Sequence, residues 1–288
     1  MKRSLFIWTF RLLRATALAV LVFILVLWCG QRFVYFRPTK MTETPAGERV
    51  SLARRFPRGM PIVETDFRSA DGTRLTGAVF LSGDTVDENT IPVLFCHGNG
   101  GWMGHETEWV FFPYAPGPAE YAFFLFDYRA YGYSDGSVWG LDEWKFYADA
   151  RAARTWLAEY VKKPETEVVL MGHSLGGAVA VDLAQDGTPG LVLCSTFDSL
   201  PDVAQRHLQY FPVKWLVADG FRSAEKIVTV SAPVLMFHGT RDRTVPIACG
   251  ERLFEAAREP KNFVEMGCGH DDIPVSEVRK AMKEFLKR

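Results

Sequence analysis

The sequence predicts one large α/β domain with a mostly parallel central sheet and helices on both faces. Short apolar runs alternate with stretches of helical spacing along most of the chain, which is the order that crossover connections between parallel strands produce. The chain has 288 residues, of which 48% are hydrophobic. That length and composition allow one substantial core and an N-terminal appendage.

Residues 1–36 are expected to form a membrane anchor that is apolar from about residue 5 to residue 30. The run from Ala15 to Gly30 carries no charge, and helical continuation upstream would bring it to the roughly 20 residues that span a bilayer. An uncleaved transmembrane helix is favoured over a cleaved signal peptide, because bulky Trp28 lies where a cleavage site needs small residues. Basic residues flank the run on both sides in similar number, so the side of the membrane stays open.

Residues 37–61 are expected to form a linker, because Pro, Thr, Gly and Arg are frequent there. The folded domain then covers residues 62–288, with a short lid at about residues 197–226. An antiparallel hairpin is predicted around the turn Asp71-Gly72. The predicted strands are residues 63–67, 73–81, 93–96, 122–126, 168–171, 191–194, 234–237 and 262–266. The predicted helices follow Gly177 or cover residues 141–161, 200–219 (one or two short helices), 246–258 and 274–287.

Charge and cysteine content exclude several classes of protein. The net charge of -1 gives no support for a nucleic-acid partner. The five cysteines are scattered and odd in number, so neither a disulfide framework nor a zinc site is expected. Cys268, His270 and Asp272 lie close together, but no second group of ligands accompanies them. No cofactor or metal is predicted, and the oligomeric state stays open.

A serine lies in a sharp turn, Gly172-His-Ser174-Leu-Gly176, between a predicted buried strand and a predicted helix. Glycine at both ends of the turn removes Cβ atoms that would collide there, so the Ser174 hydroxyl can project as a nucleophile. The free N–H of Leu175 at the start of the helix can bind a developing oxyanion. An isolated pentapeptide of this kind is equally consistent with an ordinary glycine turn, so partner residues must decide.

Two such partners follow the last two predicted strands. His270 comes directly after the last strand, on a glycine-rich loop, and Asp242 comes directly after the strand before it. Because parallel strands end at one edge of a sheet, these loops meet. The chain order Ser174, Asp242, His270 fits a nucleophile, an acid and a base. Asp198, which follows an earlier strand, is the alternative acid, and Asp242 is favoured.

A second oxyanion donor is expected in the loop His97-Gly-Asn-Gly-Gly101, which follows an early strand. A hydrolase of this kind takes a backbone N–H from that place. Asn99 or Gly100 is the predicted source. An ordinary glycine turn is the alternative interpretation.

Together these motifs resemble the α/β-hydrolase superfamily, and they are most similar to its small-lidded, often membrane-anchored branch, described as serine aminopeptidase-like or dienelactone-hydrolase-like. The resemblance covers roughly residues 63–287 and implies a catalytic domain with a serine nucleophile. Ala130 is a departure, because the family commonly has glycine at this position. The motifs that carry the resemblance are Gly172-His-Ser-Leu-Gly-Gly177, His97-Gly-Asn-Gly-Gly101, Asp127-Tyr-Arg-Ala-Tyr-Gly-Tyr-Ser134, His238-Gly-Thr-Arg-Asp-Arg-Thr-Val-Pro246 and Gly269-His270.

The leading functional hypothesis is a membrane-anchored serine hydrolase that cleaves an ester, thioester or related acyl bond through an acyl-enzyme. Its partner would be a small-molecule or lipid-like acyl substrate. Trp102, Met103 and Phe197 are the candidate pocket residues. A serine peptidase or aminopeptidase is the alternative, although no acidic group that would hold a substrate amine is evident. A catalytically silent membrane adaptor is the third hypothesis, and the complete set of expected partners argues against it.

Overall fold

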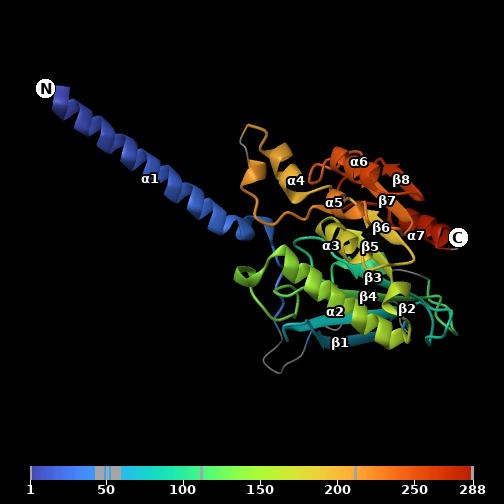
Figure 1. The fold of residues 1–288 in the computed structure, drawn as a ribbon. Helices are drawn as coiled ribbons and strands as arrows, with labels where there is room; N and C mark the ends of the chain where they lie inside the picture. The colour runs from blue at the N-terminus through green and yellow to red at the C-terminus, as the bar shows by residue number, and fades with distance from the viewer. Residues whose placement is uncertain are drawn as a thin grey trace.

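A computed structural model describes residues 2–42, 49, 52, 60–110, 113–210 and 213–286 of the chain. Figure 1 shows a long N-terminal helix, α1 (Lys2–Tyr35), which projects from a domain where helices pack against a central sheet. The sheet has eight strands in the order β1-β2-β4-β3-β5-β6-β7-β8.

The sheet is mostly parallel, as predicted. β1 and β2 pair in antiparallel fashion, as do β2 and β4, and every other neighbouring pair is parallel. The carboxyl ends of the six strands from β3 to β8 therefore meet at one edge. The strands are β1 (Ile62–Arg68), β2 (Arg74–Leu81), β3 (Ile91–Cys96), β4 (Tyr121–Asp127), β5 (Val169–His173), β6 (Leu191–Cys194), β7 (Val234–Gly239) and β8 (Lys261–Met266).

Two apolar cores lie on opposite faces of the sheet, because successive side chains of a strand point to opposite sides. In β3, Leu94 and Cys96 belong to one core, whereas Val93 and Phe95 belong to the other. The first core is covered by α2 (Glu143–Val161), α3 (Leu175–Ala184), α5 (Ser223–Ile227) and α6 (Ile247–Ala256), and the second by α7 (Val275–Phe285) with the segment 102–109.

The region of the predicted lid lies between β6 and β7 and contains short helical elements besides α5. It holds α4 (Leu200–His207) and the 3₁₀ turn η5 (Val213–Trp215), and residues 211–212 lie outside the described part of the chain. Ser199 caps α4 by accepting a hydrogen bond from Asp202 N, which satisfies a donor that the helix leaves free. The other 3₁₀ turns are η2 (Glu106–Val110), η3 (Val138–Gly140) and η4 (Glu165–Glu167).

The prediction of a transmembrane helix is not supported by the structure. Arg11 and Arg14 lie within α1 and interrupt its apolar sequence. Among the residues that the structure describes, no helix is both long and apolar enough to cross a membrane.

The end of α1 is joined to the domain more closely than a separate anchor and linker would be. Phe36 is 1% exposed and packs against Phe146 with ring centroids 5.1 Å apart. Met41 N donates to Gly132 O, and Gly132 N donates to Thr39 O, each at 2.8 Å. The first residues of the predicted linker thus run along the domain. Its residues 43–48, 50–51 and 53–59 lie outside the described part of the chain.

Candidate active site

Ser174 lies in a strained turn between β5 and α3, as the glycine pattern predicts. Its backbone has φ 53° and ψ -120°, a combination that a residue with a side chain adopts only when its surroundings enforce it. Thr196 Oγ1 donates to Ser174 O at 2.8 Å, which holds the turn against β6. A Cβ atom on Gly176 would lie 1.9 Å from the Cys96 carbonyl oxygen, so only glycine allows this approach of helix to strand.

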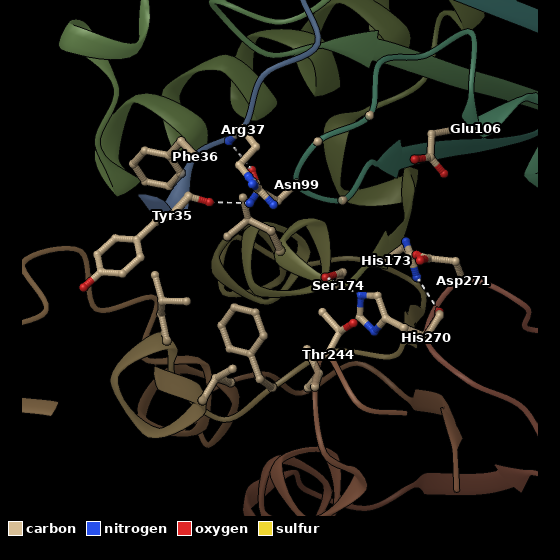
Figure 2. A pocket seen from close by; sticks show the side chains of 18 of the residues that line it. Tyr35, Phe36, Arg37, Asn99, Glu106, His173, Ser174, Thr244, His270 and Asp271 are labelled. Carbon is tan, nitrogen blue, oxygen red and sulfur yellow. Dashed lines mark hydrogen bonds between the residues drawn. The ribbon is translucent and has the colours of Figure 1, made fainter. Parts of the chain in front are cut away.

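Ser174, His270 and Asp242 form one hydrogen-bonded chain. His270 Nε2 lies 3.0 Å from Ser174 Oγ, and His270 Nδ1 lies 2.7 Å from Asp242 Oδ2. Figure 2 shows the imidazole beside the serine hydroxyl. His270 follows β8 and Asp242 follows β7, so neighbouring parallel strands bring the two side chains together. This arrangement can move a proton from a hydroxyl to an imidazole.

The surroundings of Asp242 stabilise its ionised form. Burial alone would raise the pKa of this carboxyl, but hydrogen bonds from His238 and His270 outweigh it and hold the pKa well below the usual range. Its other oxygen accepts hydrogen bonds from Thr244 N and Val245 N, each at 2.8 Å. Asp242 is therefore a fixed negative charge beside the imidazole of His270.

Asp198, the alternative acid, has a different partner. Arg252 Nε donates to Asp198 Oδ2 at 2.7 Å. Burial raises the pKa of Asp198 above its ordinary value, against the opposing effect of Arg252. The structure thus brings Asp242, and not Asp198, to the ring of His270.

The loop after β3 passes directly beside the serine. A Cβ atom on Gly98 would lie 3.4 Å from Ser174 Cβ. Asn99 and Gly100 follow at the wall of the same cavity, and Leu175 borders it from the start of α3. The backbone N–H groups of these three residues, predicted as oxyanion donors, remain candidates for that role.

The side chain of Asn99 is turned toward the end of α1. Its Oδ1 accepts hydrogen bonds from Arg37 N and from the Tyr131 hydroxyl, both at 2.9 Å, and its Nδ2 donates to Tyr35 O. We call these three contacts the Asn99 clamp. Figure 2 shows the contacts to Tyr35 and Arg37 opposite Ser174. Asn99 therefore links the loop beside the serine to the N-terminal segment.

A cavity of about 510 Å³ lies between these elements. Phe197 lines it, as predicted, whereas Trp102 and Met103 do not appear in its wall. They are 1% and 3% exposed and belong to the core on the α7 face, because the chain turns inward after the glycine loop. The lining residues are Tyr35, Phe36, Arg37, Gly98, Asn99, Gly100, Gly101, His105, Glu106, His173, Ser174, Leu175, Phe197, Leu200, Val203, Thr244, Val245, His270 and Asp271.

Several of these wall residues were not predicted. Tyr35 and Phe36 come from the end of the supposed anchor, and Glu106 comes from η2. No spacing or motif in the sequence indicates that these segments meet the serine. His173 and Asp271 are the wall residues that lie next to the predicted Ser174 and His270 in the sequence.

His173 supports the loop that carries His270. Its Nε2 lies 3.2 Å from the backbone oxygen of His270, and burial lowers its pKa to about 4. It is therefore neutral at physiological pH and can donate to this carbonyl. A neutral, buried histidine here helps to hold the loop of His270 in place.

Within the described residues, one group of side chains could hold a metal ion. Potential ligand atoms of His173, His270 and Asp271 all lie within 4.8 Å of one another. Both ring nitrogens of His270 already contact Ser174 and Asp242. An ion bound to that ring would therefore displace one of these contacts.

The chain belongs to the α/β-hydrolase family. A family model described as alpha/beta hydrolase fold matches residues 91–220. The chain is 35% identical over 268 residues to the uncharacterized protein Rv2307c of Mycobacterium tuberculosis, and this match covers 91% of the chain and 89% of Rv2307c. It is 32% identical over 205 residues to human alpha/beta hydrolase domain-containing protein 17B, with 68% of this chain and 66% of that protein covered.

Solved structures of esterases share the fold. The esterase Pf2001 of Pyrococcus furiosus matches with a TM-score of 0.65 and 18% identity, covering 88% of this chain and 98% of its own. The esterase RhEst1 of Rhodococcus sp. ECU1013 matches with a TM-score of 0.55 and 18% identity, covering 78% and 98%. At this level of identity the comparison establishes the fold and leaves the substrate to the residues of the site.

Proposed function

We propose that this protein is a serine hydrolase that cleaves an ester, thioester or related acyl bond through an acyl-enzyme. The observation that carries the proposal is the hydrogen-bonded chain Ser174–His270–Asp242, with contacts of 3.0 and 2.7 Å, at the wall of a cavity. A protein that kept only the fold would have no need for this alignment.

In the proposed reaction, Ser174 Oγ attacks the acyl carbon while His270 Nε2 accepts its proton. The bond to the leaving group breaks as His270 returns that proton to the departing oxygen or sulfur. Water then attacks the acyl carbon of the acyl-enzyme while His270 Nε2 accepts a proton from it. His270 returns this proton to Ser174 Oγ as the acyl bond to the serine breaks, and the acid is released. Asp242 stabilises the imidazolium in each half, and the N–H of Leu175 with that of Asn99 or Gly100 binds the oxyanion.

The cavity favours an acyl group over a peptide amine. Phe36, Phe197, Leu200 and Val203 give it an apolar wall. Glu106 also borders it and is the kind of group that an aminopeptidase would use. Burial raises its pKa to about 7, so Glu106 is only partly charged at neutral pH and is a weak partner for a substrate ammonium.

We also propose that α1 holds the domain at a membrane. The support is the exposure of apolar side chains along the helix, among them Leu12, Leu13, Leu18 and Leu21 at 62–69%. Alkaline carbonate extraction of membranes from cells that express the full chain tests this. Recovery of all the protein in the soluble fraction of the cell lysate, before any carbonate treatment, would overturn this proposal.

Labelling with a fluorophosphonate probe tests the chemistry. Wild type is expected to label and Ser174→Ala is not, whereas Ser137→Ala, which changes an exposed serine, serves as the matched control. Equal labelling of wild type and Ser174→Ala would refute the nucleophile. A panel of p-nitrophenyl esters of rising chain length beside aminoacyl anilides then tests the substrate class, and a preference for anilides would favour the peptidase.

A further inference from the structure

Four large aromatic side chains are strongly exposed on η3, at the start of α2 and in the stretch from α4 to η5. Trp139, Trp144, Tyr210 and Trp215 have exposed fractions of 76%, 67%, 86% and 82%. We call this group the aromatic collar. Large apolar groups gathered at one place on a surface mark an interaction site.

Two of the segments that carry collar residues contact the last turns of α1. Phe33 packs edge-on against Trp139, with ring centroids 4.4 Å apart. On another side of α1, Gln31 Oε1 accepts a hydrogen bond from Ala218 N at 2.9 Å, a few residues after Trp215. Figure 1 shows α4 and the start of α2 on either side of the helix end.

A buried carboxylate fixes this arrangement. Asp219 Oδ1 accepts a hydrogen bond from Glu143 N at 3.0 Å, next to Trp144. The other oxygen of Asp219 lies 3.5 Å from Arg32 Nε on α1. The start of α2, the segment after η5 and the end of α1 are thus bound to one side chain, so the collar has a defined position relative to the helix.

The chemistry of the collar matches a bilayer interface. Tryptophan and tyrosine combine an apolar ring with a polar N–H or O–H, and they concentrate where hydrocarbon meets headgroups. Trp139 contacts the end of α1, and Trp144 and Trp215 lie on segments tied to that end. The helix itself exposes apolar side chains along its length. A bilayer would cover the collar and the adjoining apolar helix together, which makes lipid the better match.

We propose that the aromatic collar is a docking surface for a lipid bilayer and that the hydrolase takes acyl lipids from that bilayer. The substrate part of this inference rests on the proposed hydrolase function. The end of α1 and α4 also supply Phe36, Leu200 and Val203 to the wall of the cavity. An acyl chain that leaves the bilayer at the collar therefore meets apolar side chains that lead toward Ser174.

Fluorescent labels test the docking surface without any use of activity. The four cysteines that the structure describes as free are buried, so full-length protein with Cys29→Ser offers a background for single labels. Trp139→Cys and Trp215→Cys place an NBD dye in the collar. Ser276→Cys on α7, an exposed position at the opposite end of the domain in Figure 1, is the control.

In phosphatidylcholine–phosphatidylglycerol vesicles that contain doxyl lipid, the labels at 139 and 215 should be quenched at least about twofold more than the label at 276. This contrast is expected because interfacial aromatics sit at headgroup depth. Equal quenching at all three positions would overturn the docking surface and would favour a protein partner for the collar.

A second experiment tests the lipid substrate. Serine replaces all four collar residues, and hydrolysis of p-nitrophenyl butyrate in solution is compared with hydrolysis of a long-chain ester embedded in vesicles. We expect the variant to hydrolyse the vesicle substrate about tenfold more slowly than wild type and the soluble ester at nearly the wild-type rate. A variant that keeps the wild-type rate on both substrates would refute the inference. If wild type cleaves neither ester, the hydrolase proposal fails, while the labels still decide the docking surface. If the variant loses both activities, the two esters are compared instead with Trp139→Cys and Trp215→Cys, each of which changes one collar residue.

Discussion

The two sides of the cavity are built in different ways. Ser174, Asp242 and His270 each follow a strand of one parallel sheet, so the backbone pairing of β5 to β8 fixes their relative positions. The opposite wall is formed by the end of α1 and by α4. It is held by side-chain contacts such as those of Asn99 to Tyr35 and Arg37. A wall held by side chains should yield to substitution more readily than a set of groups held by a sheet.

The largest effect is expected on the sheet side of this comparison. His270→Ala and Asp242→Asn should each lower kcat about 10⁴-fold, because the serine then lacks a correctly oriented base. Asp198→Asn, which changes the alternative acid, should alter kcat less than threefold, to within about 0.6 kcal/mol. Steady-state hydrolysis of p-nitrophenyl esters measures all three. A severe loss in Asp198→Asn together with a mild one in Asp242→Asn would transfer the acid role to Asp198.

One pair of glycine substitutions compares the two sides directly. Gly176→Ala would place its Cβ 1.9 Å from the Cys96 carbonyl oxygen, in backbone that cannot yield. We expect it to lower the free energy of unfolding by at least about 3 kcal/mol or to prevent folding. Gly100→Ala meets nothing nearer than Arg37 O at 3.7 Å and has only the strain of φ +93°, about 1–2 kcal/mol.

Urea unfolding of both glycine variants, followed by circular dichroism, measures the difference. Equal destabilisation would show that the loop facing α1 is as tightly constrained as the serine turn. It would thereby break the contrast between the two walls.

A smaller effect is expected from the clamp between the walls. Asn99→Ala removes the contacts to Tyr35, Arg37 and Tyr131, and we expect kcat to fall about tenfold, equivalent to 1.4 kcal/mol. Tyr131→Phe removes one contact and should lower kcat only about twofold. Asn99→Asp keeps an acceptor for Arg37 N and should recover part of the rate. Unchanged kcat and KM in Asn99→Ala would show that the clamp has no bearing on catalysis.

The smallest expected effect is a dependence of stability on pH. Asp127, at the end of β4, is fully buried, and burial raises its pKa to about 7 despite a 2.6 Å hydrogen bond from Met103 N. The unfolded chain releases this proton near pH 4. The free energy of unfolding should therefore fall as pH rises from 5 to 8, by on the order of 1 kcal/mol.

Asp127→Asn should reduce that slope, which denaturant titrations at several pH values would measure. Asp242 has a pKa below its usual range, so this carboxyl of the serine side does not titrate in this interval. An unchanged slope in Asp127→Asn would assign the pH dependence to another group, such as Glu106.

Sequence patterns predicted the sheet well because its signals are local. The strand Leu191–Cys194 has the predicted bounds, and β8 begins one residue before the predicted strand. Because parallel strands end together, two residues far apart in the chain could be placed beside Ser174 from strand order alone. The same reasoning led to Asp242 ahead of Asp198, and the hydrogen bond to His270 agrees with it.

Contacts that depend on side chains from distant, irregular segments could not be predicted in this way. Asn99 and Arg37 are 62 residues apart and share no periodic pattern. Trp102 and Met103 were placed in the pocket because they follow the glycine loop, yet the direction of the chain after a loop has no local signal. The contacts that place Trp139 and the segment after Trp215 beside α1 are of the same kind.

The packing of Phe36 has a practical consequence for preparing a truncated form of the protein. A cut before Arg37, at the border between the supposed anchor and linker, would remove a buried aromatic ring and the carbonyl that Asn99 binds. It would also turn Arg37 N into a charged terminus beside Asn99 Oδ1. A shortened protein for crystallisation should therefore begin before Gln31, so that the last turns of α1 stay with the domain whose cavity they help to enclose.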